Sequence, residues 1–257
     1  MKNTLIALAV AASAAVSGHA MAWTPNGLGG SVEMGGIFSP ASLQGPWEVK
    51  VGDVVKGLDA TFEKGQKTAE ISLKSAIPLL GIRTQTSDAF KGQQGISPQI
   101  SYGDAVDMES FSAGTASLTL NIKDSQGESL GKAETIMGAA AIASFKGSDG
   151  QGVYKVYATD SGSGFFGGVA KQPEAVHPDP LGFAGEVFAD VAKNYNPQDI
   201  SDSASAGKVD FSETEHTFSA FYVSAIPVSS KINISLDKEI DGTVQWNASL
   251  PITVSYV

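Results

Sequence analysis

The stretch VQWNASLPITVSYV, residues 244–257, indicates how the fold is completed. Apolar and polar side chains alternate along it, which is typical of a β-strand with one buried face. We therefore predict one strand across residues 244–257, with Pro251 turned away from the ladder because proline has no N–H. This strand lies at the end of the sequence, so we expect its uncovered edge to pair elsewhere in the chain or on another molecule. The apolar face comprises Val244, Trp246, Ala248, Leu250, Ile252, Val254 and Tyr256.

Residues 1–22 have the composition of an export signal. Lys2 precedes an apolar run over residues 5–16, and small residues stand at Ala20 and Ala22. The apolar run is shorter than the ~20 residues that a membrane-spanning helix needs. We therefore predict a signal peptide over residues 1–22, cleaved before Trp23, and an exported protein.

The composition excludes several classes of protein. The 257 residues include 17 Lys and Arg against 27 Asp and Glu, and the formal net charge is −10. An acidic chain of this kind is a poor ligand for nucleic acid, so we expect no nucleic-acid partner. Cysteine is absent, which excludes disulfides and thiolate metal sites.

Short alternating runs broken by Gly, Asp, Asn and Ser recur along the chain and favour an all-β sandwich. We predict that DSQGES closes a hairpin within residues 116–136 and that Asp241-Gly242 closes another within residues 231–246. The other alternating runs cover residues 47–55, 69–77, 152–158 and 216–226.

One segment has helical rather than alternating spacing. Asp179-Pro180 opens it and Asn196-Pro197 closes it, as helix boundary rules require. We predict a helix over residues 180–195 inside an insertion at about residues 138–207, which is rich in Gly, Ser and Asp. The apolar stripe of this helix comprises Ala184, Val187, Phe188, Val191 and Tyr195.

No motif in the chain supports catalysis. Two histidines, His177 and His216, remain after the predicted cleavage, and they form a poor zinc set without cysteine. The residues from Asp237 onward resemble the start of a twelve-residue calcium-binding loop. The twelfth position, which needs a glutamate, is Ala248. We predict no enzymatic activity, no catalytic residue, no cofactor and no metal.

A second alternating stretch, NGLGGSVEMGGIF, follows the predicted cleavage site at residues 26–38. Glycine loses much conformational entropy in a strand, so this stretch needs a groove to hold it. Pairing with the last strand of the same chain and pairing with another molecule both fit the composition. The face that would enter a groove comprises Leu28, Gly30, Val32, Met34 and Gly36.

The chain resembles the FaeG-like fimbrial subunits that Gram-negative enteric bacteria assemble by the chaperone–usher pathway. The resemblance is close at both ends and thin in the middle. It is carried by TLIALAVAASAAVSG (residues 4–18), NGLGGSVEMGGIF (26–38), WEVKVGD (47–53) and QWNASLPITVSYV (245–257).

This resemblance implies an incomplete immunoglobulin-like β-sandwich over residues 38–257, preceded by a donor-strand extension over residues 23–37. A periplasmic chaperone would lend a strand to the gap, and the extension of the next subunit would replace it at the outer-membrane usher. The assembled fimbrium would lie at the cell surface. The donor side chains would come from the Leu28–Gly36 face, and the acceptor strand would present Trp246, Leu250, Ile252, Val254 and Tyr256.

Two alternatives to a purely structural subunit remain open. In the first, the inserted region also binds host glycans, with Tyr154, Phe165 and Phe166 as rings that could stack on a sugar. In the second, the chain is an unrelated secreted β-sandwich binding protein. Polymerisation would distinguish a fimbrial subunit from an unrelated secreted protein. Glycan binding by the polymer would distinguish a glycan-binding subunit from a purely structural one.

Overall fold

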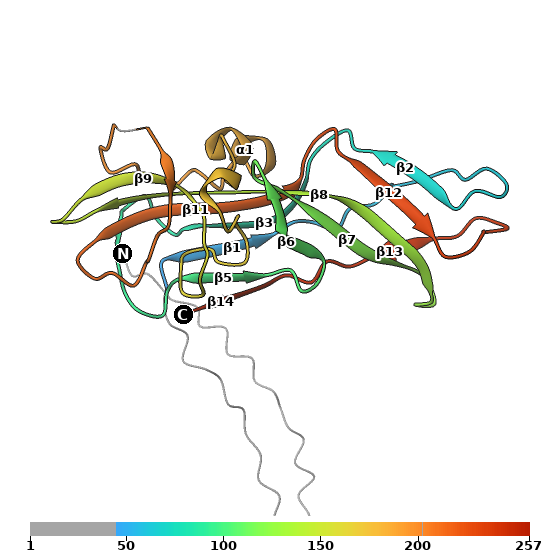
Figure 1. Ribbon diagram of the computed structural model, residues 1–257, viewed down its shortest axis with the longest axis horizontal. Helices are drawn as coiled ribbons and strands as arrows, with labels where there is room; N and C mark the ends of the chain where they lie inside the picture. Colours follow the sequence, from blue (N-terminus) through green and yellow to red (C-terminus); the bar gives the residue numbers. More distant parts are fainter. Residues whose placement is uncertain (1–44, 202) are drawn as a thin grey trace, which may run out of the picture. The chain divides into compact units, whose positions relative to one another are not determined.

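The computed structural model describes residues 45–201 and 203–257, which form an all-β sandwich with open sheets (Figure 1). This confirms the predicted fold class. The predicted signal peptide and the donor-strand extension lie outside the described residues. The described strands are β1 (Trp47–Val51), β2 (Thr68–Ser72), β3 (Ile77–Thr84), β4 (Phe90–Lys91), β5 (Pro98–Ser101), β6 (Val106–Ser112), β7 (Thr115–Asp124), β8 (Ser129–Lys146), β9 (Gln151–Val156), β10 (Ser205–Gly207), β11 (Thr217–Ile226), β12 (Lys231–Leu236), β13 (Trp246–Ala248) and β14 (Thr253–Tyr256).

The main sheet has the order β1-β3-β11-β8-β12-β2, and β14 pairs with β5 in a second sheet. The long strand β8 is the backbone of the main sheet. Its first half pairs with β7 and β12, and its second half pairs with β11 and β9. All these pairings of β8 are antiparallel, and short hairpin connections join β8 to β7 and to β9.

Strand β11 is buried on both faces, which agrees with its mostly apolar sequence. Phe218, Ala220 and Tyr222 enter the main core between the sheets. Phe221 and Val223 enter a second, smaller core on the opposite face of the strand. Helix α1 and the segment that follows it cover this second core.

The two hairpin predictions had different outcomes. The β7–β8 hairpin is confirmed, with Lys123 paired to Ser129 next to the turn. The predicted hairpin over residues 231–246 is wrong, because β12 lies between β8 and β2 whereas β13 pairs with β7. A turn signal identifies a change of direction, but the partner of each strand depends on the rest of the sheet.

The helix is shorter than predicted. Helix α1 spans Pro180–Val187, and the Asp179 carboxylate caps it by accepting the Gly182 N–H at 2.9 Å. Phe188 has an extended backbone, and residues 189–194 form turns rather than a continued helix. The stripe is nevertheless apolar and packed: Phe188 and Val191 are buried and Val187 is partly buried. Packing of these side chains onto the sheet therefore overrides the helical periodicity.

The insertion that contains α1 begins later in the chain than predicted. Gly138, the predicted start of the insertion, lies inside β8 and pairs with Ala225 of β11. The chain leaves the sheet after β9, passes through a 3-10 turn (Pro173–Ala175) and α1, and returns as β10 parallel to β9.

Candidate strand-acceptor site

The C-terminal stretch has the predicted alternation, but it forms two strands instead of one. Strands β13 and β14 are separated by residues 249–252, which include Pro251. The prediction of a continuous strand is therefore wrong, because proline lacks the N–H that a ladder requires. The alternation persists through the break, since the even-numbered residues from Trp246 to Val254 are half-buried and the residues between them are exposed.

Three strands around this stretch each have a free edge. Strand β13 pairs with β7 on one side, and β14 pairs with β5 on one side. Strand β1 is the terminal strand of the main sheet, with β3 as its partner. Within residues 45–201 and 203–257, no strand pairs with the opposite edge of any of the three.

Two tryptophan indoles link the β1 side to the C-terminal side at opposite ends. The Trp47 indole N–H donates to the Ile96 carbonyl at 2.7 Å, and the neighbouring Ser97 N–H donates to the Val257 carbonyl at 3.1 Å. At the other end, the Trp246 indole N–H donates to the Leu58 carbonyl at 3.1 Å. Residues 47–58 and residues 246–257 therefore run in opposite directions with an unpaired gap between them. We call this gap the acceptor slot.

Apolar side chains at the acceptor slot are exposed although they belong to the core face. Trp47, Val49 and Val51 alternate onto one face of β1, yet their exposed fractions rise from 7% to 44% and 56%. Tyr256 across the slot is 39% exposed. Partial burial of its hydroxyl raises the pKa of Tyr256 above its ordinary value. An unpaired edge beside uncovered apolar side chains is a site for strand pairing or aggregation.

The predicted acceptor residues lie on one wall of the slot. Trp246, Leu250, Ile252 and Val254 pack partly against the main core. The predicted donor residues Leu28, Gly30, Val32, Met34 and Gly36 lie outside the described residues. Three side chains after β1 that were not predicted also pack partly against the main core, and their alternation in GLDATFE is the signal that could have indicated them. They are Leu58, Ala60 and Phe62.

The predicted glycan-stacking residues do not form one surface. Phe165 is fully buried and packs against Trp47, Phe211 and Tyr222 with ring centroids 5.6–5.8 Å away, so it is a core residue and not a sugar platform. Phe166 is partly buried and lines a small pocket of about 230 Å³, to which Tyr154 does not contribute.

Tyr154 lies on β9 with its ring centroid 5.0 Å from that of Phe145. Phe165 has a left-handed backbone, with φ 62°, within a glycine-rich loop. The loop places the Phe165 ring in the main core, and nothing in the sequence indicated this position.

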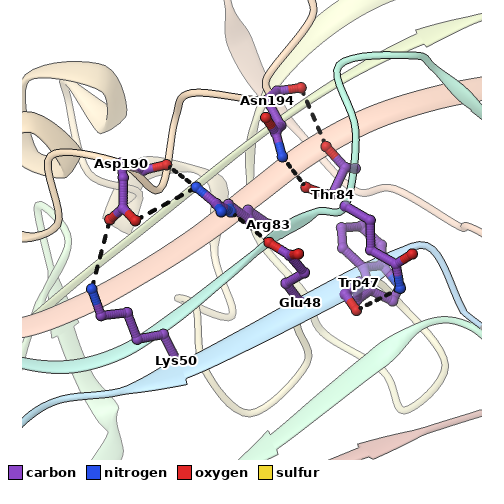
Figure 2. Close-up of polar contacts among 8 residues, drawn as sticks. Trp47, Glu48, Lys50, Arg83, Thr84, Asp190 and Asn194 are labelled. Carbon is purple, nitrogen blue, oxygen red and sulfur yellow. Dashed lines mark hydrogen bonds and ion pairs between the residues drawn. The ribbon is translucent and has the colours of Figure 1, made fainter. Parts of the chain in front are cut away.

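A larger pocket, of about 490 Å³, opens on the other face of β1 and β3. Its apolar lining includes Phe188 and Val191, and Val49 borders it at the open edge of β1. Its charged rim is centred on Arg83, which lies between Glu48 and Asp190 in Figure 2. Two cationic and two anionic side chains line the pocket, so its charge is balanced. The four are Arg83, Lys50, Glu48 and Asp190.

The described residues show neither a membrane span nor a metal centre. None of their helices is long and apolar enough to cross a bilayer. Among the same residues, no group of three or more His, Asp or Glu side chains is arranged to hold a metal ion. His216 lies between Asp149 and Glu213, 2.8 Å and 2.6 Å away, but these carboxylates approach opposite ring nitrogens and cannot share one ion with the ring.

These features define a β-sandwich protein with unpaired edges next to an uncovered part of its core. The chain belongs to the family described as "Fimbrial, major and minor subunit", which matches residues 1–257. It is similar to K88 fimbrial protein AC of Escherichia coli, with 26% identity over 287 residues, and to F41 fimbrial protein of Escherichia coli, with 29% identity over 290 residues. Both alignments cover 100% of each chain.

Membership of this family confirms the resemblance drawn from the two ends of the sequence. The chain is a fimbrial subunit that associates with other fimbrial subunits in fimbriae at the cell surface. The family comprises major and minor structural subunits of fimbriae.

Proposed function

We propose that this fimbrial subunit polymerises by donor-strand exchange, with residues 23–37 of one copy filling the acceptor slot of the next. The observation that carries the proposal is the pair of free edges around exposed, core-facing valines. An incoming strand would satisfy the backbone groups of both edges and cover Val49 and Val51. Strand addition of this kind takes its affinity from backbone hydrogen bonds and its register from alternating side-chain pockets.

The slot also accounts for the partners that the proposal requires. Leu28, Val32 and Met34 would enter between the β1 wall and the wall formed by Ile252 and Val254, and glycines would fit where the slot is narrow. Before assembly, an empty slot exposes apolar surface and an unpaired edge, which favours aggregation. A periplasmic chaperone would cover it with a strand of its own, and the outer-membrane usher would be the place of exchange.

Deletion of residues 23–37 from the exported chain tests this proposal. The deleted chain should still form a one-to-one complex with a co-expressed periplasmic chaperone, because its acceptor slot is intact. It should form no polymer, because it has no strand to donate. Size-exclusion chromatography and electron microscopy measure both outcomes.

The matched control keeps the composition of residues 23–37 but shuffles their order, so that the apolar alternation is lost. This variant should also fail to polymerise. Polymers of the deleted chain would contradict the proposal.

A second candidate function is adhesion to host cells through glycans, and the balanced pocket on β1 and β3 favours it. Ligand pockets commonly measure about 300–1,000 Å³ and combine an apolar lining with a few polar groups. A neutral polyhydroxylated ligand fits a rim in which cationic and anionic groups cancel. Its hydroxyls could donate to Glu48 and Asp190 and accept from Lys50 while its apolar face covers Phe188.

Lys50→Met tests this candidate, because it removes the rim ammonium that lies over the Phe188 ring and keeps an unbranched apolar side chain of similar length. The affinity of the assembled fimbriae for a neutral glycan on an array should fall roughly tenfold. This is about the free energy that one hydrogen bond to a charged group contributes. Lys208→Met is the matched control, because Lys208 pairs with Asp160 and does not line the pocket. Equal binding by both variants, or no glycan bound by the parent fimbriae, would contradict this function.

A further inference from the structure

A segment after α1, residues 188–196, lies across the outer face of β1 and β3, and we call it the strap. Phe188 and Val191 of the strap are buried and approach Gly81 of β3, where an added Cβ would lie 3.4–3.5 Å from their side chains. Gly81 pairs with Lys50 of β1, and the Lys50 ammonium lies 5.3 Å from the centroid of the Phe188 ring. The strap therefore contacts both strands at the free edge of the main sheet.

Arg83 of β3 connects the strap to β1. Its Nε donates to the Glu48 carboxylate at 2.9 Å, and Glu48 is its directly opposite partner on β1. Its Nη1 donates to the Asp190 carbonyl of the strap at 2.6 Å and lies 3.6 Å from the Asp190 carboxylate. Figure 2 shows the Arg83 side chain reaching Glu48 on one side and Asp190 on the other.

A second contact joins the strap to the same strand. The Asn194 side-chain amide donates to the Thr84 carbonyl at 2.7 Å, and the Thr84 hydroxyl donates to the Asn194 carbonyl at 3.2 Å. The strap is thus fixed at two neighbouring positions of β3, and Arg83 extends this attachment to the edge strand.

Edge strand β1 needs this support while the acceptor slot is empty. Among the described residues its backbone ladder is shared with β3 alone, and its two valines, Val49 and Val51, are more than 40% exposed. A strand in the slot would give β1 a second ladder and would cover those valines. The contribution of the strap to the position of β1 should therefore be large before the slot is filled and small afterwards.

We propose that Arg83 is a positioning residue that holds β1 against the strap so that the empty acceptor slot stays ready for an incoming strand. This inference rests on the proposed donor-strand function. Arginine suits the task because its planar fork can donate to a carboxylate and a carbonyl at once, whereas lysine cannot reproduce that geometry.

The test measures how fast a synthetic peptide of residues 23–37 enters the full exported chain held in its chaperone complex. Arg83→Met should slow peptide uptake about tenfold and speed hydrogen exchange of the β1 amides, because β1 loses its tie to the strap. Arg83→Lys should restore part of the uptake rate. Lys231→Met is the matched control: it removes a cross-strand ion pair with Glu70, 2.9 Å long, on the other edge of the sheet, and it should leave uptake unchanged.

A filled-slot background separates positioning from a general effect on stability. In a chain that carries residues 23–37 after Val257, Arg83→Met should change the exchange of β1 amides less than twofold. Equal effects in the empty and filled backgrounds, or uptake equal to that of Lys231→Met, would overturn the inference. If Arg83→Met does not fold, Glu48→Gln supplies the same comparison. If the parent chain takes up no peptide and the filled background shows no protection of β1, the donor-strand function itself fails.

Discussion

Moving residues 23–37 to the C-terminus, after Val257 and a turn of about four flexible residues, should yield a monomer. We call the moved segment the graft. The unfolding temperature of this monomer should lie roughly 10–30 °C above that of the same chain with Val32→Asp in the graft. The graft would return along the free edge of β14 and fill the acceptor slot of its own chain. Covering Leu28, Val32 and Met34 would contribute roughly 1.5–3 kcal/mol each. Thermal unfolding followed by circular dichroism measures the difference, and size-exclusion chromatography checks that the product is a monomer.

Two matched changes show whether the graft lies in the slot. Val32→Asp places a charge where an apolar pocket is expected and should erase most of the gain. Ser31→Asp puts the same charge on the opposite face of the strand and should leave the gain nearly intact. These opposite outcomes at neighbouring positions require an alternating strand with one buried face.

The length of the linker tests the direction of the graft. A short turn forces the graft antiparallel to residues 246–257 and, because the two walls of the slot run oppositely, parallel to β1. The reverse direction requires a linker that spans the slot, about 12 residues or ~40 Å in extended conformation. We expect the short linker to be sufficient. No gain in unfolding temperature with either linker would contradict the donor-strand proposal.

The sequence predicted the fold class and the alternating burial of residues 246–254, because both depend on local alternation. A strand with one buried face carries a two-residue period wherever its partners lie, and Trp246, Leu250, Ile252 and Val254 show that period directly. The partners themselves are non-local. The chain bends at Asp241-Gly242, yet β13 pairs with β7 and not with β12.

The parts that sequence reasoning misplaced are those set by packing between distant segments. The helix ends at Val187 because Phe188 and Val191 pack onto Gly81 of β3, which is more than 100 positions away. The Arg83 cluster had no sequence signature, because it joins β1, β3 and the strap, and charged residues in strands usually only face solvent. Phe165 was misassigned for the same reason: a ring in a glycine-rich loop gives no local sign of burial.

Phe165→Ala should lower the free energy of unfolding by about 3–5 kcal/mol, the usual cost of removing a buried phenylalanine ring. Phe165 has no exposed surface and contacts Trp47, whose indole links β1 to the Ile96 carbonyl at one end of the acceptor slot. A cavity beside Trp47 should therefore loosen that end of the slot as well as the core. Chemical denaturation of the monomer with the C-terminal graft measures the loss without interference from polymerisation.

Phe166→Ala is the matched control for that substitution, because it removes the same ring from the next position of the chain. Phe166 is only partly buried, and its backbone carbonyl, which accepts the Ile100 N–H at 2.8 Å, is unaffected by the change. Its cost should therefore be well below that of Phe165→Ala, since fewer packing contacts are lost. Stability retained in Phe165→Ala together with a loss of glycan binding would mean that this ring acts at the surface. Stability lost in Phe165→Ala and largely kept in Phe166→Ala would place Phe165 in the core and leave the balanced pocket on β1 and β3 as the place to look for a glycan.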